Sequence, residues 1–500
     1  MTQAGGSPTR VVMFVMNDLL NDPRVQREAR SAVRAGFRVT VVAMQSARCH
    51  VRREMVDGYE VVRVRYHRSI LRFLVLRLLW LGSLAALVLA EGFKLAVGLP
   101  PGPKAPGQDS TKPSIFRQIK WALMRGAGLL LFPLRAFRPL LVQLARRAQA
   151  TAPLREERWK RVLQFIWDVG FARDTFWISL AMLWASRSER AAVFHGNDLP
   201  TLPLTTWAAF LHRGKALYDS HEFWVGMNPQ NTAFFDGMSR WVEARYIHRM
   251  DAVVTVNDLI ADELRRQYQV PQPTVVMNCP EPVVPRLVDP AHSIRATLGL
   301  SPEMPIILYQ GRYEPGRGLE ELIESGRYLS KGIIVLRGYG SNEADLRQRV
   351  AGLGVPGRVF MVDPVPMADL VSAASEADVG VVPYTAYSPG YYYASPNKLF
   401  EYMFAGLAIA VSNLPFLEKL VRDHDLGVVF EPSDPRQIAA QLNALVGKPE
   451  RLRACRANAT RAGRARYHWD HEGGKLIELY KTLAAANTRR GSANLCRPSP

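Results

Sequence analysis

The strongest constraint on the fold is an alternation of short β-branched runs with amphipathic helical patterns, which occurs in two series along the chain. Such an alternation is typical of parallel α/β construction. The helix predicted at residues 24–35 ends at Gly36, a residue that suits a helix C-terminus, directly before the next strand. In the first half of the chain, strands are predicted at residues 11–16, 38–43, 60–65, 191–195, 216–219 and 252–256.

The second series follows the proline-rich segment 280–290. Its predicted strands are residues 306–310, 332–337, 359–362, 379–383, 408–412 and 428–430, and its predicted helices are 319–329, 342–353 and 398–405. The fold class is therefore α/β, with two Rossmann-like, doubly wound domains at residues 1–285 and 286–465. The carboxyl ends of both sheets would face the cleft between the domains, where open α/β folds bind their ligands.

Residues 67–189 interrupt the first series with an apolar and basic insertion. Between residues 67 and 170 there are 17 Lys and Arg against 5 Asp and Glu, so this stretch holds most of the net charge of +19. Segments 71–99 and 126–144 are strongly apolar, but the longest uncharged run, 78–90, has 13 residues, and a spanning helix needs about 20. We expect helices that lie on a membrane surface, with their basic residues on lipid phosphates. The alternatives are a helical subdomain packed on the protein itself, an oligomer contact, or a re-entrant or spanning segment.

Charge and cysteine usage narrow the class of protein further. A net charge of +19 calls for an anionic partner, which could be nucleic acid, anionic lipid or a phosphate-bearing substrate. Nucleic acid is the least favoured of these, because the basic residues cluster with aliphatic side chains and no recognition motif is present. We expect no signal peptide, since the segment before the first predicted strand is polar and only ten residues long. Reduced thiols, no zinc site and a cytoplasmic location are predicted from four cysteines without metal-ligand spacing: Cys49, Cys279, Cys455 and Cys496.

Residues 311–318, with the sequence GRYEPGRG, follow a predicted strand and precede a predicted helix. A glycine-bracketed turn at a helix N-terminus presents backbone N–H groups to an anion. Two arginines five residues apart add positive charge that suits a diphosphate. Gly311, Arg312 and Arg317 are therefore candidate binding residues, and an ordinary charged turn is the alternative.

A second candidate site is the start of the helix that follows residue 395. Ser395 is the predicted N-cap and Pro396 the first helical residue. Lys398 and Glu401 lie in the first turns, and a carboxylate at such a place can accept hydrogen bonds from vicinal hydroxyls, as acidic residues do on ribose in dinucleotide folds. The alternative for Glu401 is a solvated helix charge.

In the first half, polar and titratable residues follow two predicted strands. His195, Asn197 and Asp198 come at the end of one strand, and His221 and Glu222 follow another. A single histidine at a strand end is more often a structural residue. Two such strand ends at one sheet edge favour a site, and these five residues are the candidate catalytic group.

Taken together, these stretches resemble glycosyltransferase family four, a family of retaining enzymes with the two-domain GT-B fold that includes bacterial enzymes of polysaccharide and glycan biosynthesis. The resemblance covers nearly the whole chain apart from the insertion. It rests on the order and spacing of DPRVQREA (22–29), HGNDLPTLP (195–203), YDSHEFW (218–224), YQGRYEPGRGLEELI (309–323), DVGVVPY (378–384) and SPNKLFEYMFAGLAI (395–409).

The resemblance implies roles for residues of the second domain. Arg312 and Arg317 would hold the diphosphate of a nucleotide-sugar donor, and Glu401 would bind the nucleotide ribose. Asn397, Lys398 and Leu399 would offer their backbone to the phosphate and sugar, and Gly338 and Gly340 would lie near the nucleotide. The helix near 474–486, within residues 466–487, would return to the first domain as in GT-B folds, followed by a disordered tail at 488–500.

The chain departs from the family pattern at two places. Many members have another Glu eight positions before the ribose-binding one, where this chain has Tyr393. Many also have His-x-His after the fourth strand, where this chain has His195-Gly196-Asn197. Asn197 would hydrogen-bond the sugar without taking a proton, which makes His221 a candidate for acceptor-side chemistry.

Glycosyl transfer requires stabilisation of a departing nucleotide diphosphate, and Arg312, Arg317, Lys398 and helix N-termini can supply it. Because no Asp-x-Asp follows a strand, we expect no metal and no cofactor beyond the nucleotide sugar. The basic insertion suggests a lipid-linked or glycan acceptor and an anionic membrane surface at the inner face of the cell membrane. A nucleotide-sugar epimerase and a non-catalytic membrane scaffold of the same fold are the alternatives.

Overall fold

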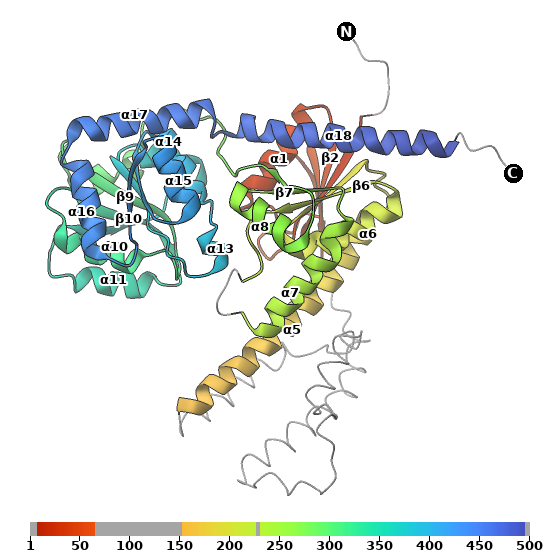
Figure 1. Ribbon diagram of the computed structural model, residues 1–500, viewed down its shortest axis with the longest axis horizontal. Coiled ribbons are helices and arrows are strands. Elements are labelled where there is room, and N and C mark those ends of the chain that lie inside the picture. Colours follow the sequence, from red (N-terminus) through yellow and green to blue (C-terminus); the bar gives the residue numbers. More distant parts are fainter. Residues whose placement is uncertain (1–7, 66–152, 227–230, 496–500) are drawn as a thin grey trace, which may run out of the picture.

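The computed structural model describes residues 8–65, 153–226 and 231–495, which form two α/β domains (Figure 1). The apolar segments 71–99 and 126–144 of the insertion lie outside the described residues. Within the described ranges, no helix is both long and apolar enough to cross a membrane.

The N-terminal sheet is parallel except at one edge. Its strand order is β3-β4-β2-β1-β5-β6-β7-β8, and β3 pairs antiparallel with β4. The predicted strands are present, but the sequence missed β3 and β8, which are short edge strands. The strand bounds are β1 Arg10–Phe14, β2 Arg38–Met44, β3 Arg53–Val56, β4 Tyr59–Val64, β5 Val193–Asn197, β6 Lys215–Ser220, β7 Ala252–Thr255 and β8 Thr274–Val275.

Helices cover both faces of this sheet because the central strand β1 is buried on both sides. Val12 and Phe14 pack under α5 (Pro153–Ala185) and α6 (Leu202–His212), whereas Val11 and Met13 pack under α1 (Pro23–Arg34) and α18 (Trp469–Leu495). Buried strands of parallel sheets read as continuous apolar runs for this reason. Two further helices, α7 (Ala233–Tyr246) and α8 (Asp258–Tyr268), complete the domain.

The C-terminal sheet is wholly parallel, with the order β11-β10-β9-β12-β13-β14. Its strands are β9 Ile306–Tyr313, β10 Ile333–Gly340, β11 Val359–Val362, β12 Val379–Val382, β13 Ala408–Ser412 and β14 Gly427–Phe430. Its helices are α9 Ile294–Leu298, α10 Leu319–Ser325, α11 Glu343–Ala351, α12 Leu370–Ala374, α13 Pro389–Tyr392, α14 Asn397–Ala405, α15 Pro415–Asp423, α16 Pro435–Val446 and α17 Pro449–Ala465.

Strands β9 and β10 are longer than predicted, because glycines let them pair closely at their carboxyl ends. Gly338 pairs with Gly311, and a Cβ on Gly338 would lie 1.8 Å from the Gly311 carbonyl oxygen. Gly340 pairs with Tyr313 in the same way. The turn predicted from residue 311 therefore begins only after Tyr313.

The chain returns from α17 on the C-terminal domain to α18, which packs along α1 of the N-terminal domain (Figure 1). Trp469 is fully buried there, and its Nε1 donates a hydrogen bond to Ser31 Oγ at 2.8 Å. Farther along, Tyr480 and Leu476 are buried against the first domain. The tail predicted to be disordered from residue 488 is wrong in part, since α18 continues to Leu495.

Candidate active site

A cleft of about 780 Å³ lies between the two domains and is lined by residues of both. From the N-terminal domain it receives the predicted residues His221 and Glu222, and also Arg24, which the sequence had not singled out. From the C-terminal domain it receives the predicted residues Gly311, Arg312, Arg317, Ser395, Asn397, Lys398 and Glu401. The structure thus brings together two groups that are separated by about ninety residues or more in the sequence.

The end of β9 and the turn after it place positive charge on the cleft wall. Arg312 extends from the strand and Arg317 from the turn, and Glu314 contacts both. Arg312 Nε lies 2.6 Å from Glu314 Oε1, and Arg317 Nη2 lies 3.3 Å from Glu314 Oε2. Glu314 also lines the cleft, a position that sequence reasoning missed.

Aromatic rings enclose the Arg317 guanidinium. It lies 4.5 Å from the ring centre of Tyr384 and 5.0 Å from that of Tyr391, and its Nη1 donates a hydrogen bond to Tyr384 Oη. Burial opposes the charge of Arg317, but the hydroxyls of Tyr384 and Tyr309 and the Glu314 carboxylate raise its pKa. These contacts hold the Arg317 guanidinium in the cleft as a permanent positive charge.

The N-terminus of α14 points into the same cleft. The helix begins at Asn397 with Pro396 as N-cap and no side-chain cap, so the prediction of Ser395 as N-cap is wrong. Pro396 fixes its own backbone in an extended conformation, which ends the preceding loop one residue later than predicted. The Ser395 hydroxyl is buried and has no hydrogen-bond partner among the described residues. An uncapped helix N-terminus leaves N–H groups available to an anion.

Lys398 is buried on the first turn of α14. Its Nζ lies 3.7 Å from the ring centre of Tyr309, and a Cβ on Gly311, whose φ of +143° is rare for other residues, would lie 2.7 Å from this Nζ. Burial and the nearby Arg317 lower the pKa of Lys398 well below its ordinary value. Burial raises the pKa of Glu401, against the opposing charges of Lys398 and Arg27. Both groups would gain from an anionic, hydroxyl-bearing ligand.

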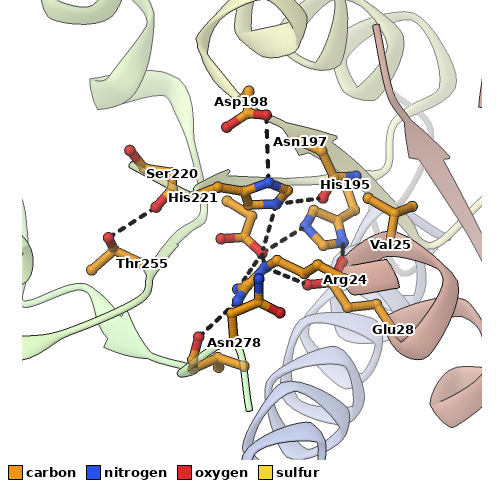
Figure 2. A network of polar contacts seen from close by, with 12 residues as sticks. Arg24, Val25, Glu28, His195, Asn197, Asp198, Ser220, His221, Thr255 and Asn278 are labelled. Atoms are coloured by element: carbon orange, nitrogen blue, oxygen red, sulfur yellow. Dashed lines mark hydrogen bonds and ion pairs between the residues drawn. The ribbon is translucent and has the colours of Figure 1, made fainter. Parts of the chain in front are cut away.

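The N-terminal wall of the cleft rests on a buried polar network (Figure 2). Arg24 Nη2 lies 2.7 Å from Asp219 Oδ2, and Arg24 Nε lies 3.0 Å from Glu28 Oε1. His221 lies beside this pair, with its Nε2 3.5 Å from Asp219 Oδ2 and its Nδ1 3.4 Å from Asp198 Oδ2. Arg24 and Asp219 are 195 positions apart in the sequence.

The two histidines of the network have very different pKa values. Burial opposes protonation of His221, but Asp198 and Asp219 outweigh it and raise its pKa to about 10. Burial lowers the pKa of His195 to about 3. Asp219 stays ionised despite burial, because Arg24 and His221 lower its pKa. At neutral pH His221 is therefore an imidazolium and His195 is neutral.

Several predicted site residues lie outside the cleft. His195 is completely buried and its Nδ1 hydrogen-bonds Tyr480 Oη of α18 at 2.7 Å, so it cannot touch a substrate. Asn197 is also buried: its Nδ2 donates to the Phe14 carbonyl at 3.1 Å, and its Oδ1 accepts from His221 Nε2 at 3.1 Å. Asn197 therefore holds the His221 ring in place, whereas His195 lies 3.8 Å from Asp219 Oδ2.

Leu399 of the second domain is predicted to contribute only its backbone. Its side chain is fully buried in the core between α14 and the sheet, so this role stays a prediction for the backbone alone. Gly338 and Gly340 permit strand pairing and are not part of the cleft lining. Asp198 of the first domain likewise does not line the cleft, and it acts on His221.

Tyr393, at the position where many relatives have Glu, joins the two domains. Its ring lies 5.5 Å from that of Phe223 in the first domain, and its carbonyl accepts a hydrogen bond from Asn257 Nδ2 at 2.7 Å. The departure from the family pattern is thus an interdomain contact beside the cleft.

Glu28, His195 and Asp219 bring potential metal-ligand atoms within 4.8 Å of one another. The Arg24 guanidinium contacts both carboxylates of this group, so it already serves as their counter-ion. Positive charge at this distance disfavours a divalent cation. The absence of a metal requirement remains a prediction.

Comparison with known proteins matches two families to the two domains. Residues 135–280 match Glycosyltransferase Family 4, and residues 291–462 match Glycosyl transferases group 1. The chain is 28% identical over 209 residues to the D-inositol 3-phosphate glycosyltransferase of Thermobispora bispora, a match that covers 38% of this chain and 46% of that one. It is 23% identical over 256 residues to the alpha-D-kanosaminyltransferase of Streptomyces kanamyceticus, with coverages of 50% and 64%. The chain thus spans about half to two thirds of the length of these relatives.

Solved structures share the architecture at low identity. The sucrose-phosphate synthase of Thermosynechococcus elongatus superposes with a TM-score of 0.63 at 16% identity, covering 96% of this chain and all of that one. Anabaena HepE in complex with UDP and glucose superposes with a TM-score of 0.58 at 12% identity, covering 95% of this chain and 100% of that one. With both domains matched in order and the two-sheet architecture shared, the chain belongs to glycosyltransferase family 4 and has the GT-B fold.

Proposed function

We propose that the protein transfers a sugar from a nucleotide-diphosphate sugar to an acceptor, with retention of the anomeric configuration. The observation that carries the proposal is the convergence of Arg312, Arg317 and Lys398 on one cleft, at the uncapped N-terminus of α14. Glu401 lies on the same helix and lines the same cleft. Positive charge beside a carboxylate suits a diphosphate joined to a ribose.

In this mechanism the bond between the sugar C1 and the diphosphate oxygen breaks while a bond from the acceptor oxygen forms on the same face. The acceptor proton passes to the departing phosphate oxygen. Arg312, Arg317 and the α14 N-terminus stabilise the charge that develops on this oxygen. Burial and the nearby Arg317 lower the pKa of Lys398, and an anion bound beside it favours its charged form.

The acceptor side of the cleft contributes His221 and Glu222. With a pKa raised to about 10, His221 is a cation at neutral pH and acts as a hydrogen-bond donor rather than as a base. Burial and Asp198 raise the pKa of Glu222. A carboxyl group of this kind can bind acceptor hydroxyls, and closure of the domains would keep water from the sugar.

Calorimetric titration tests donor binding. UDP, GDP, ADP and their common sugar conjugates are titrated without metal into the wild type, Glu401→Gln and a control, Glu418→Gln, whose carboxylate pairs with Arg422 on the exposed side of α15. One nucleotide is expected to bind wild type and control equally, and Glu401→Gln about tenfold more weakly, equivalent to roughly 1.4 kcal/mol. No binding by folded wild-type protein would refute the transferase proposal and favour a membrane scaffold. The anomeric configuration of the product, read by NMR, tests retention.

The proposal includes a membrane-proximal acceptor at the inner face of the cell membrane. It is supported by an exposed aromatic layer on two helices that pack together, α5 and α6. Trp184 is 69% exposed and Phe210 is 72% exposed. The layer consists of Phe176, Leu180 and Trp184 at four-residue spacing on α5, and Trp207, Phe210 and Leu211 on α6.

Basic residues border this layer. Arg187, Arg190 and Arg213 are exposed near the C-terminal ends of the two helices, and α6 contains no Asp or Glu. Exposed aromatic side chains rimmed by arginine suit an anionic bilayer. The free cysteines Cys49, Cys279 and Cys455 agree with a reducing, cytoplasmic side.

Vesicle sedimentation tests the membrane proposal. Vesicles with about one third phosphatidylglycerol are expected to bind the wild type and a control, Met367→Ser, which changes an exposed side chain of the other domain. The double variant Trp184→Ser, Phe210→Ser is expected to bind severalfold more weakly, because bilayer affinity follows buried apolar area. Equal binding of this variant would refute the assignment to α5 and α6.

A further inference from the structure

Glu314 lies between the two arginines that the proposed function assigns to the donor diphosphate. Each of its carboxylate oxygens contacts a different guanidinium, at 2.6 Å from Arg312 Nε and 3.3 Å from Arg317 Nη2. In the part of the chain that the structure describes, the ion pairs of both arginines are made with Glu314. The carboxylate lines the cleft and its side chain is 29% exposed, so an incoming anion can reach it.

The local backbone explains this placement. Strand β9 ends at Tyr313, so Arg312 lies on the strand and Glu314 is the first residue after it. The chain then turns: the Arg317 N–H donates to the Glu314 carbonyl at 3.3 Å, and Gly316 has a φ of +80°. The turn returns Arg317 to the carboxylate of Glu314.

We propose that Glu314 is an internal competitor for the donor site, which neutralises Arg312 and Arg317 in the empty cleft and must release them when a diphosphate binds. The inference rests on the proposed function, since it assumes that these arginines bind the donor diphosphate. It goes beyond that function by assigning an opposing role to a residue of the same cleft wall.

The charge of the ligand determines how strongly Glu314 opposes it. A nucleotide sugar has no terminal phosphate, whereas the released nucleoside diphosphate has one, whose second ionisation lies near pH 6. At pH 7.5 the product therefore carries about one more negative charge than the donor. Repulsion by a carboxylate grows with ligand charge. Glu314 is thus expected to weaken product binding more than donor binding and to assist release of the leaving nucleotide.

Calorimetry on Glu314→Gln tests the inference. Inorganic pyrophosphate and the nucleoside diphosphate selected by the donor titration are the first two probes, and the matching nucleotide sugar is the third. Glu314→Gln removes one negative charge from beside two arginines, so we expect this variant to bind pyrophosphate and nucleoside diphosphate about fivefold or more tightly than the wild type does. The nucleotide sugar is expected to gain less, by about a factor of two or more.

Two further variants separate charge from position. Glu321→Gln removes the same charge from α10, and no ion pair joins Glu321 to either arginine in the described structure, so it is expected to match the wild type. Glu314→Ala removes charge and contacts together, and it is expected to follow Glu314→Gln. Unchanged or weaker pyrophosphate binding by both Glu314 variants would overturn the inference and indicate that Glu314 only positions the arginines.

Failure of the proposed function has a different signature. If wild type and Glu321→Gln bind neither pyrophosphate nor any nucleotide, the donor site itself is refuted and the inference falls with it. If the wild type binds and neither Glu314→Gln nor Glu314→Ala gains affinity, only the inference falls. In turnover, Glu314→Gln is expected to show product inhibition at a severalfold lower nucleotide concentration, with a smaller change in KM for the donor.

Discussion

Replacing Arg24 by methionine is expected to remove a large part of the stability of the N-terminal domain. The Arg24 side chain is 2% exposed, and those of its partners Glu28 and Asp219 are fully buried. Arg24 Nη1 also donates to the Val276 carbonyl at 2.9 Å. Methionine keeps much of the apolar volume of arginine but leaves the carboxylates without their cation.

The magnitude follows from the geometry. Two unit charges 2.7 Å apart attract by about 6 kcal/mol at an effective dielectric constant of 20. Desolvation offsets part of this attraction, and removal of one partner of a buried pair costs about 3–5 kcal/mol. Burial raises the pKa of Glu28, so this group can take up a proton when Arg24 is lost. We therefore expect a loss of about 3 kcal/mol, at the lower end of that range.

Urea unfolding followed by tryptophan fluorescence measures the loss, with Arg34→Met as the matched control. Arg34 lies on the same helix, is 63% exposed and pairs only distantly with Glu281, at 3.7 Å, so its replacement is expected to cost less than about 1 kcal/mol. In a thermal scan, 3 kcal/mol corresponds to roughly 6–12 °C for a domain of this size. The double variant Arg24→Met, Glu28→Gln is expected to recover part of the loss. A cost below about 1 kcal/mol for Arg24→Met would refute the reasoning.

Two other predictions concern pH and backbone conformation. The pKa of His221 is raised to about 10 in the folded protein, against about 6.5 in the unfolded chain. The stability that its protonation contributes is therefore complete below about pH 6.5 and is lost as the pH rises toward 10. The loss amounts to up to about 1.4 kcal/mol per pH unit. The difference in unfolding free energy between wild type and His221→Gln is therefore expected to shrink between pH 7 and 9, and a constant difference would contradict the assigned pKa. Gly318→Ala is expected to cost about 2 kcal/mol or more, since φ is +64° there and a Cβ would lie 1.8 Å from the Pro383 carbonyl oxygen. Gly474→Ala, at a helical position with open space around it, is expected to be neutral or stabilising by up to about 1 kcal/mol, and equal losses in both variants would argue against the strain at Gly318.

The two sheets could be predicted because each strand is a local signal. Apolar runs such as residues 408–412 are buried on both faces and need no distant information to be recognised. Strand β3 was missed because Arg53–Val56 is a partly polar edge strand. The ends of β9 and β10 were missed because glycine pairs such as Gly338 with Gly311 look like turn residues in the sequence.

The donor side of the site could be predicted for a similar reason. Arg317, Lys398 and Glu401 lie beside the turn and helix N-terminus that place them, within a few residues of sequence. The other wall depends on distant partners. The sequence predicts His195 as a catalytic residue, but Tyr480, 285 positions away, hydrogen-bonds it in the interior.

The buried ion pair of Arg24 could not be predicted from the neighbouring sequence alone. The stretch 22–29 was recognised as a family motif, yet the partner that holds Arg24, Asp219, comes from a strand 195 positions later. The local signal that could have drawn attention to Arg24 is its spacing from Glu28: an arginine four residues before a glutamate lies on the same helix face.

The most direct test of the central claim is a crystal structure of the wild type with the nucleoside diphosphate that calorimetry selects. We expect diphosphate oxygens within about 3.2 Å of Arg312, Arg317 and the N–H groups at the start of α14, with the ribose hydroxyls on Glu401. In that complex the Glu314 carboxylate is expected to contact neither arginine. A nucleotide bound elsewhere, or bound in the cleft with Glu401 and both arginines out of reach, would contradict the assignment of this cleft as the donor site.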